Sequence, residues 1–190
     1  MPNCTPSWIV SQSQNPRSRT ATPVVSLNRA RPNMGHTWTP NCPTYFLPIP
    51  YGEGWALYCE SLGKELGLYD DPYQYFGMLS AEMHRAIRLV VDPGLHAKGW
   101  TREQAIRYSL DNEAEPEASI ISEIERYMAG PGQALSYKVG QLKIRELRNR
   151  AAEKLREKFD IRAFHNEVLE SGCVPLHVLE EKIDRWISSI

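Results

Sequence analysis

Two glutamates in the stretch YGEGWALYCE have a spacing that suggests chemistry. Glu53 and Glu60 are seven positions apart, close to two helical turns, so both would project from one face of a helix. Carboxylates on such a face can bind a metal ion or transfer protons. A structural explanation is also open, in which Glu53 complements the dipole of the first helical turn and Glu60 pairs with Lys64. Spacing alone favours this structural explanation.

Three further side chains are candidates for contacts with a substrate or an oxyanion. Arg88 follows Arg85 by one turn, and an arginine fork can hold a carboxylate through two hydrogen bonds, although a structural link to Asp92 fits equally. His96 is predicted in a loop, DPGLHAKG, where it could donate to an oxyanion, transfer a proton, or serve only the structure. Tyr137 follows a Gly-Pro-Gly turn and could donate to an oxyanion. Its place on an apolar stripe also suits a buried tyrosine.

Composition narrows the class of protein. The chain has 190 residues, enough for one domain with a hydrophobic core, and a formal net charge of -1, which predicts no nucleic-acid partner. No apolar run is long enough for a membrane-spanning helix. The first residues lack the apolar region of a secretory signal, so a cytoplasmic location is the default expectation. Four well-separated cysteines favour reduced thiols, and no phosphate-binding or nucleophile-elbow motif occurs.

A change in composition near residue 50 divides the chain into two predicted parts. Residues 1–50 hold most of the 14 prolines and no aspartate or glutamate, which predicts an irregular arm. Residues 51–190 follow helical spacing without strand-like alternation, so the predicted fold is all-α. The predicted helices, placed from their end signals, are 53–66, 72–92, 101–110, 115–128, 132–158, 160–171 and 175–190.

Four long motifs occur in a characteristic order: EGWALYCE, RAIRLVVDPGLHAKGWTREQAI, ERYMAGPGQALSYKVGQLKIRELR and FDIRAFHNEVLESGCVPLHVLEEKIDRW. In this order they resemble the C-terminal part of the family known as domain of unknown function 885. The resemblance runs from about Gly52 to Trp186, and residues 1–50 are expected to be unrelated to the family. This family is similar to zinc peptidases related to the helical gluzincins, so the resemblance implies a zinc-dependent hydrolase of peptides.

The resemblance also implies roles for the candidate residues. Glu53 matches the family's downstream zinc ligand, and Glu60 matches a glutamate that orients a ligand or a neighbouring helix. Arg88, His96 and Tyr137 would line the cleft and contact the substrate or the transition-state oxyanion.

One part of the family's pattern is missing. The HExxH helix, which supplies two histidine ligands and the base, should precede Glu53, but residues 1–50 contain no glutamate and only one histidine, His36. Only Cys4, His36 and Cys42 could substitute as ligands on that side. We therefore expect a truncated peptidase-like chain that is inactive alone, with a non-catalytic helical binding module as the alternative. Helix faces left without a partner would favour self-association.

Overall fold

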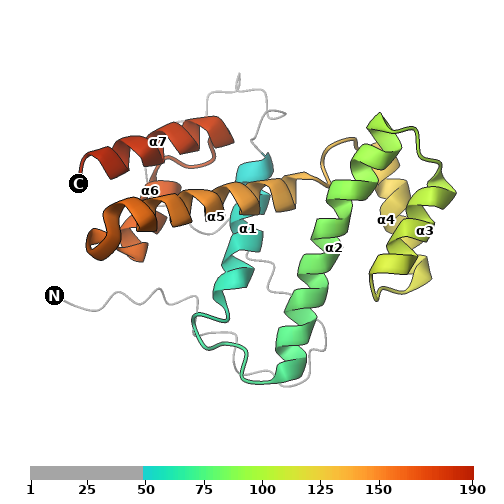
Figure 1. Cartoon of the computed structure of the whole chain (residues 1–190). Helices are drawn as coiled ribbons and strands as arrows, with labels where there is room; N and C mark the ends of the chain where they lie inside the picture. The colour runs from blue at the N-terminus through green and yellow to red at the C-terminus, as the bar shows by residue number, and fades with distance from the viewer. Residues whose placement is uncertain (1–48) are drawn as a thin grey trace, which may run out of the picture. The chain divides into compact units, whose positions relative to one another are not determined.

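The structure, a computed structural model, describes residues 49–190, which lie within one compact unit. The described residues form helices and no strand, which confirms the predicted all-α class (Figure 1). None of these helices has both the length and the apolar character needed to cross a bilayer. In chain order the helices are α1 (Ile49–Leu62), α2 (Pro72–Ala97), α3 (Arg102–Asn112), α4 (Glu117–Ala129), α5 (Ser136–Leu155), the short 3-10 helix η2 (Arg156–Lys158), α6 (Ile161–Glu170) and α7 (Leu176–Ser188).

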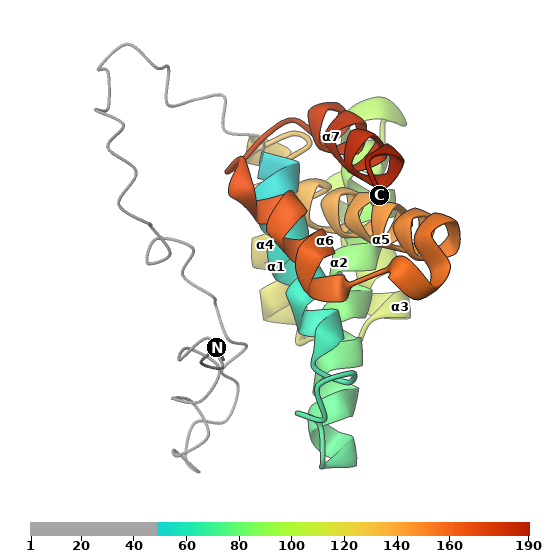
Figure 2. The same cartoon turned by 90° about the vertical axis from the view of Figure 1, so that its left-hand side faces the viewer.

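The helices pack around two hydrophobic cores. Helices α1, α5, α6 and α7 surround the first core, while α3 and α4 pack with the second half of α2 around the other (Figures 1 and 2). The first core contains Tyr51, Trp55, Tyr58, Ile144, Leu147, Ala151, Leu155, Phe164, Val168, Leu179, Ile183 and Ile187. The second contains Ile87, Val91, Ala105, Ile106, Ile120, Ile124, Tyr127 and Ala134. The α2 helix and the start of α5 connect the two groups.

The sequence predicts a capping box at Thr101 and Gln104, an apolar stripe of Ile120, Ile124 and Tyr127, and a helix stop at Gly172, and all three are confirmed. Thr101 forms a complete capping box with Gln104 at the start of α3. The predicted stripe of α4 is buried at all three positions, Ile120, Ile124 and Tyr127. Gly172 adopts the positive φ of 67° expected just after a helix end.

The predicted bounds of the first helix were wrong at both ends. Helix α1 begins at Ile49 because Pro50 lies in its first turn, where a missing backbone N–H costs no helical hydrogen bond. It ends at Leu62, four residues before the predicted end. The ring of Tyr69 packs directly over Gly63, leaving no room for a β-carbon there, and the chain turns back at this point.

The predicted end of the second helix before Pro93 was also wrong, since α2 continues to Ala97. Proline removes one helical hydrogen bond, but two others stabilise the last turn. The N–H of Lys98 donates to the carbonyl of Pro93, and that of Trp100 donates to Gly94, both at 2.9 Å. The Trp100 ring also packs on Gly94.

The apolar row predicted on this helix, Tyr75, Leu79, Ala86 and Val90, shares one face, but this is not the face that packs in the second core. Leu79 and Val90 are exposed, whereas the buried residues of α2 are Ile87, Arg88, Val91, Asp92 and Gly94.

Helix α5 begins at Ser136 rather than near Gly132. The turn before it is held by Asp92, whose two carboxylate oxygens accept from the Gly132 N–H at 3.1 Å.

Candidate functional site

The crossing of α1 and α5 positions two of the predicted site residues. Glu53 precedes Gly54 on α1, and Tyr137 lies one turn before Gly140 on α5. A β-carbon added at Gly140 would lie 2.7 Å from the α-carbon of Gly54, so the two backbones are in contact. Because glycine has no side chain to separate them, the helices approach closely enough to place Glu53 beside Tyr137.

Tyr137 and Glu53 interact electrostatically in a half-buried position. Burial raises the pKa of the Tyr137 hydroxyl, and the neighbouring Glu53 carboxylate raises it further, while Gln133 and Arg88 act in the opposite direction. The guanidinium of Arg88 lies 5.0 Å from the centre of the Tyr137 ring, on its face. Three predicted residues, Glu53, Tyr137 and Arg88, are therefore neighbours although they come from three different helices.

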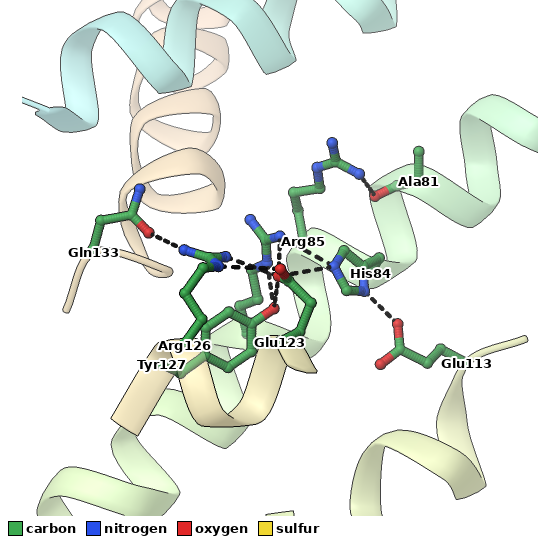
Figure 3. Close-up of polar contacts among 9 residues, drawn as sticks. Ala81, His84, Arg85, Glu113, Glu123, Arg126, Tyr127 and Gln133 are labelled. Atoms are coloured by element: carbon green, nitrogen blue, oxygen red, sulfur yellow. Dashed lines mark hydrogen bonds and ion pairs between the residues drawn. The ribbon is translucent and has the colours of Figure 1, made fainter. Parts of the chain in front are cut away.

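Arg88 is buried and is held by Glu123 and Tyr127 of α4, two side chains that Figure 3 labels. Its Nε donates to the Tyr127 hydroxyl at 2.8 Å, and one Nη donates to Glu123 at 3.0 Å. Tyr127 also donates to Glu123, at 2.8 Å. Arg126 binds both oxygens of Glu123, and these donors lower the pKa of Glu123 to about 2, with Arg126 contributing most. These contacts favour a structural role for Arg88 over binding of a substrate carboxylate. Asp92, the structural partner predicted from the sequence, binds the N–H of Gly132 instead.

His84 extends this network towards α3. Its Nδ1 lies 2.5 Å from Glu113, and its Nε2 lies 3.0 Å from the same Nη of Arg88 that binds Glu123 (Figure 3). Since arginine can only donate, Nε2 must accept, and Nδ1 carries the proton that it donates to Glu113. The histidine is thus held in one tautomer between a carboxylate and a guanidinium.

His96 lies in the last turn of α2 rather than in the predicted loop. It is exposed, and its Nε2 donates to the main-chain carbonyl of Tyr127 at 3.0 Å. The backbone of Tyr127 therefore connects His96 to the hydrogen-bond network around Arg88. Through this contact His96 joins the end of α2 to α4.

Glu60 lies two turns beyond Glu53 on α1. Burial raises the pKa of its carboxyl, Arg85 opposes the rise and Glu82 adds to it. Its proposed partner Lys64 lies instead over the ring of Tyr75, 4.8 Å from the ring centre. The Nε of Arg85 is buried without a hydrogen-bond partner among the described residues.

Sequence reasoning missed the side chains that hold this region together. Glu123 and Tyr127 are four positions apart on α4, as are His84 and Arg88 on α2. This spacing could have predicted that the two side chains of each pair lie on the same helix face. A second missed contact joins α2 to α5, where Lys138 donates to Glu82 at 2.7 Å. Nothing in the sequence indicates that these faces meet.

Glu53 has no companion metal ligands among the described residues. Within residues 49–190 no group of three or more histidine, cysteine, aspartate or glutamate side chains is close enough to share a metal ion. A catalytic zinc needs about three protein ligands. Glu53 alone therefore does not make a site, and the other suggested ligands, Cys4, His36 and Cys42, lie outside the described residues.

Comparisons with known proteins identify solved relatives. The crystal structure described as "the putative lipoprotein from Colwellia psychrerythraea" is 51% identical, with a TM-score of 0.73 over 75% of this chain. A second structure, of "a putative lipoprotein of unknown function from Shewanella oneidensis", is 26% identical, with a TM-score of 0.66 over 70% of this chain. The match covers 24% of each of those chains. No curated protein matches this chain.

A family model places the chain among known sequences. The model described as "Bacterial protein of unknown function (DUF885)" matches residues 34–183. This range begins earlier than the Gly52 expected from the motifs, includes all the candidate site residues from Glu53 to Tyr137, and ends before Trp186. The chain therefore belongs to the DUF885 family of bacterial proteins of unknown function.

Proposed function

We propose that this chain supplies one wall of the active site of a zinc-dependent peptide hydrolase. The observation that carries the proposal is the placement of Glu53 beside Tyr137, with the buried Arg88 against the tyrosine ring. Glu53 would contribute one carboxylate ligand, and the zinc would activate a water molecule for attack on a peptide bond. The remaining ligands would come from chain outside the helices described, which agrees with the span of only 24% of the solved relatives.

The chain's own residues divide into two roles under this proposal. A tyrosine hydroxyl is protonated at neutral pH, and the raised pKa of Tyr137 acts in the same direction, so the hydroxyl can donate a hydrogen bond to an oxyanion. Arg88 positions the Tyr137 ring, because its own Nε and one of its Nη groups are engaged by α2 and α4 side chains. Glu60 would orient a neighbouring helix, and His96 would hold α2 against α4.

A hybrid protein tests this proposal directly. In the hybrid, residues 49–190 replace the corresponding quarter of the 51%-identical Colwellia protein, whose sequence is close enough to accept them. We expect chelator-sensitive peptide hydrolysis and about one zinc per chain by elemental analysis. Glu53→Gln should lose both, and Glu60→Gln, the matched change two turns away, should retain the zinc. Tyr137→Phe should retain zinc and reduce kcat about a hundredfold.

The results that would contradict the proposal are equally specific. Unchanged hydrolysis and zinc content in Glu53→Gln would exclude Glu53 as a ligand. A Colwellia parent protein that neither binds zinc nor cleaves peptides would exclude the peptidase activity itself. Elemental analysis of the 190-residue chain should come first, since one tightly held zinc there would mean that a complete site forms without the hybrid.

The second candidate is a non-catalytic helical module that binds a peptide or a protein. Its supporting observation is that the described residues provide no set of three metal ligands. This candidate predicts binding without hydrolysis in the hybrid as well as in the chain alone.

We also propose an envelope location in place of the cytoplasmic default, because both solved relatives are named as lipoproteins. Fractionation of cells that carry the native gene would test this, and recovery in the cytoplasm would contradict it.

A further inference from the structure

One face of α2 carries apolar residues at the spacing of a coiled coil. Phe76, Leu79, Met83, Ala86 and Val90 follow steps of three, four, three and four, and we call this row the α2 seam. Four of its members are exposed, Phe76 at 65%, Met83 at 51%, Leu79 at 44% and Val90 at 39%. The seam is separate from the face of α2 that packs in the second core. A row of this kind is typical of a helix that packs against another helix along its length.

The α2 seam exposes enough apolar surface to form a small protein interface. With Tyr73, which is 83% exposed one turn before Phe76, it presents apolar surface on the order of 500 Å², taking about 200 Å² for each large side chain. Single exposed apolar residues are ordinary, whereas a row of this size equals the largest apolar patch of a typical monomer, which is often a functional surface. Two such patches in contact would bury about 1,000 Å², the lower limit for a specific protein interface.

The order of side-chain sizes along the seam fits a second copy in the antiparallel direction. A twofold axis through Met83 would place Phe76 opposite the second copy's Val90 and Leu79 opposite the second copy's Ala86. Each large side chain then faces a small one, as close packing requires. A parallel pair would instead place Phe76 on Phe76 and leave a gap between the two alanines.

Charges at the ends of α2 favour the same direction. Asp70 and Asp71 are exposed just before the helix, and His96 and Lys98 are exposed at its end. In the antiparallel arrangement the acidic end of each helix lies beside the basic end of the other, and the helix dipoles also oppose. A parallel pair would bring like charges together.

We propose that the α2 seam is the contact surface of an antiparallel homodimer with its twofold axis at Met83. The interface is isologous, so every contact occurs twice. It is independent of the zinc-peptidase proposal, because it involves none of Glu53, Tyr137 or Arg88.

Sedimentation equilibrium of the full chain over a wide range of concentrations provides the first test, with Met83→Glu as the variant. This change places two carboxylates against each other at the axis, where burying them unpaired is strongly unfavourable, so the dimer should weaken about a hundredfold or more. Met128→Glu is the matched control, since Met128 is 47% exposed on a different helix, α4, and is not a member of the seam. A monomer at every concentration, or equal weakening by both changes, would overturn the proposal.

Cross-linking tests the direction of the pair. Under mild oxidation Met83→Cys should form a linked dimer above the background of the unsubstituted chain, and Met128→Cys should not. Phe76→Cys should also fail to link, because Phe76 faces the second copy's Val90. A linked dimer through Phe76→Cys would show a parallel pair and overturn the antiparallel arrangement, even if Met83→Glu had folded poorly.

Discussion

Gly54 of α1 and Gly140 of α5 pack backbone against backbone. A β-carbon at Gly140 would overlap the carbonyl oxygen of Pro50 and lie 2.7 Å from the α-carbon of Gly54, and one at Gly54 would lie 2.8 Å from the backbone nitrogen of Gln141. The atoms that such a β-carbon would meet belong to the backbones rather than to flexible side chains. A β-carbon could therefore be accommodated only if a whole helix moved. This contact sets the distance between Glu53 and Tyr137.

Gly140→Ala should therefore destabilise the fold by about 3 kcal/mol or more, through overpacking at the helix crossing. Chemical denaturation monitored by circular dichroism measures the effect. Gly77→Ala is the matched control, because Gly77 lies within α2 with open space around it. There alanine should stabilise by about 0.5–1 kcal/mol through its higher helix propensity. A similar effect of the two changes would contradict the close approach of α1 and α5.

The proximity of Glu53 and Tyr137 has a spectroscopic consequence. Glu53→Gln removes the negative charge beside the phenol, so the pKa of Tyr137 should fall towards the ordinary tyrosine value while the part due to burial remains. Titration followed by NMR of 13C-labelled tyrosine resolves this residue from the others. Glu153→Gln, an exposed change further along α5, should leave the titration unaltered. If Tyr137 titrates identically in Glu53→Gln, the two side chains are not neighbours.

The hydrogen-bond network around Arg88 predicts that this residue stabilises the fold in addition to positioning the Tyr137 ring. Arg88→Met removes one donor each from Tyr127, Glu123 and His84, while Arg126 and Tyr127 still donate to Glu123, so the change should cost about 1–3 kcal/mol of unfolding free energy. Arg102→Met provides a comparison, since Arg102 pairs with Glu125 at an exposed site where solvent screens the ion pair, and its loss should change the stability much less. Thermal and denaturant unfolding would measure both. Equal costs would show that the buried network contributes nothing specific.

Glu123 should make the stability depend on pH in the acid range. Its folded pKa of about 2 is below the ordinary value, so the carboxylate stabilises the fold above about pH 4.5, and this stabilisation is lost as the pH falls towards 2. The difference in unfolding free energy between the native chain and Glu123→Gln should be at most about 2 kcal/mol near neutral pH, after allowance for solvent screening. It should shrink steadily below pH 4.5. A difference that stays constant down to pH 2 would contradict the assignment.

The sequence by itself determined the helical class, most of the helix positions and the family. Helical spacing and end signals are local, so the capping box at Thr101 and the buried stripe of α4 could be predicted from a few neighbouring residues. The motif order identified the family, which the match over residues 34–183 confirms. The zinc site, by contrast, stays a prediction that rests on resemblance.

Only the tertiary structure decided what each candidate side chain contacts. Spacing could not reveal that Arg88 is held by Glu123, 35 residues away, because that contact depends on how α2 and α4 pack. Nor could it show that α2 continues past Pro93, since the stabilising contact comes from Trp100 after the helix. Glu53 and Tyr137 meet for a similar reason, as two glycines distant in sequence allow two backbones to touch. Local patterns determine helices because their hydrogen bonds are local, whereas a site depends on packing between segments that are distant in the sequence.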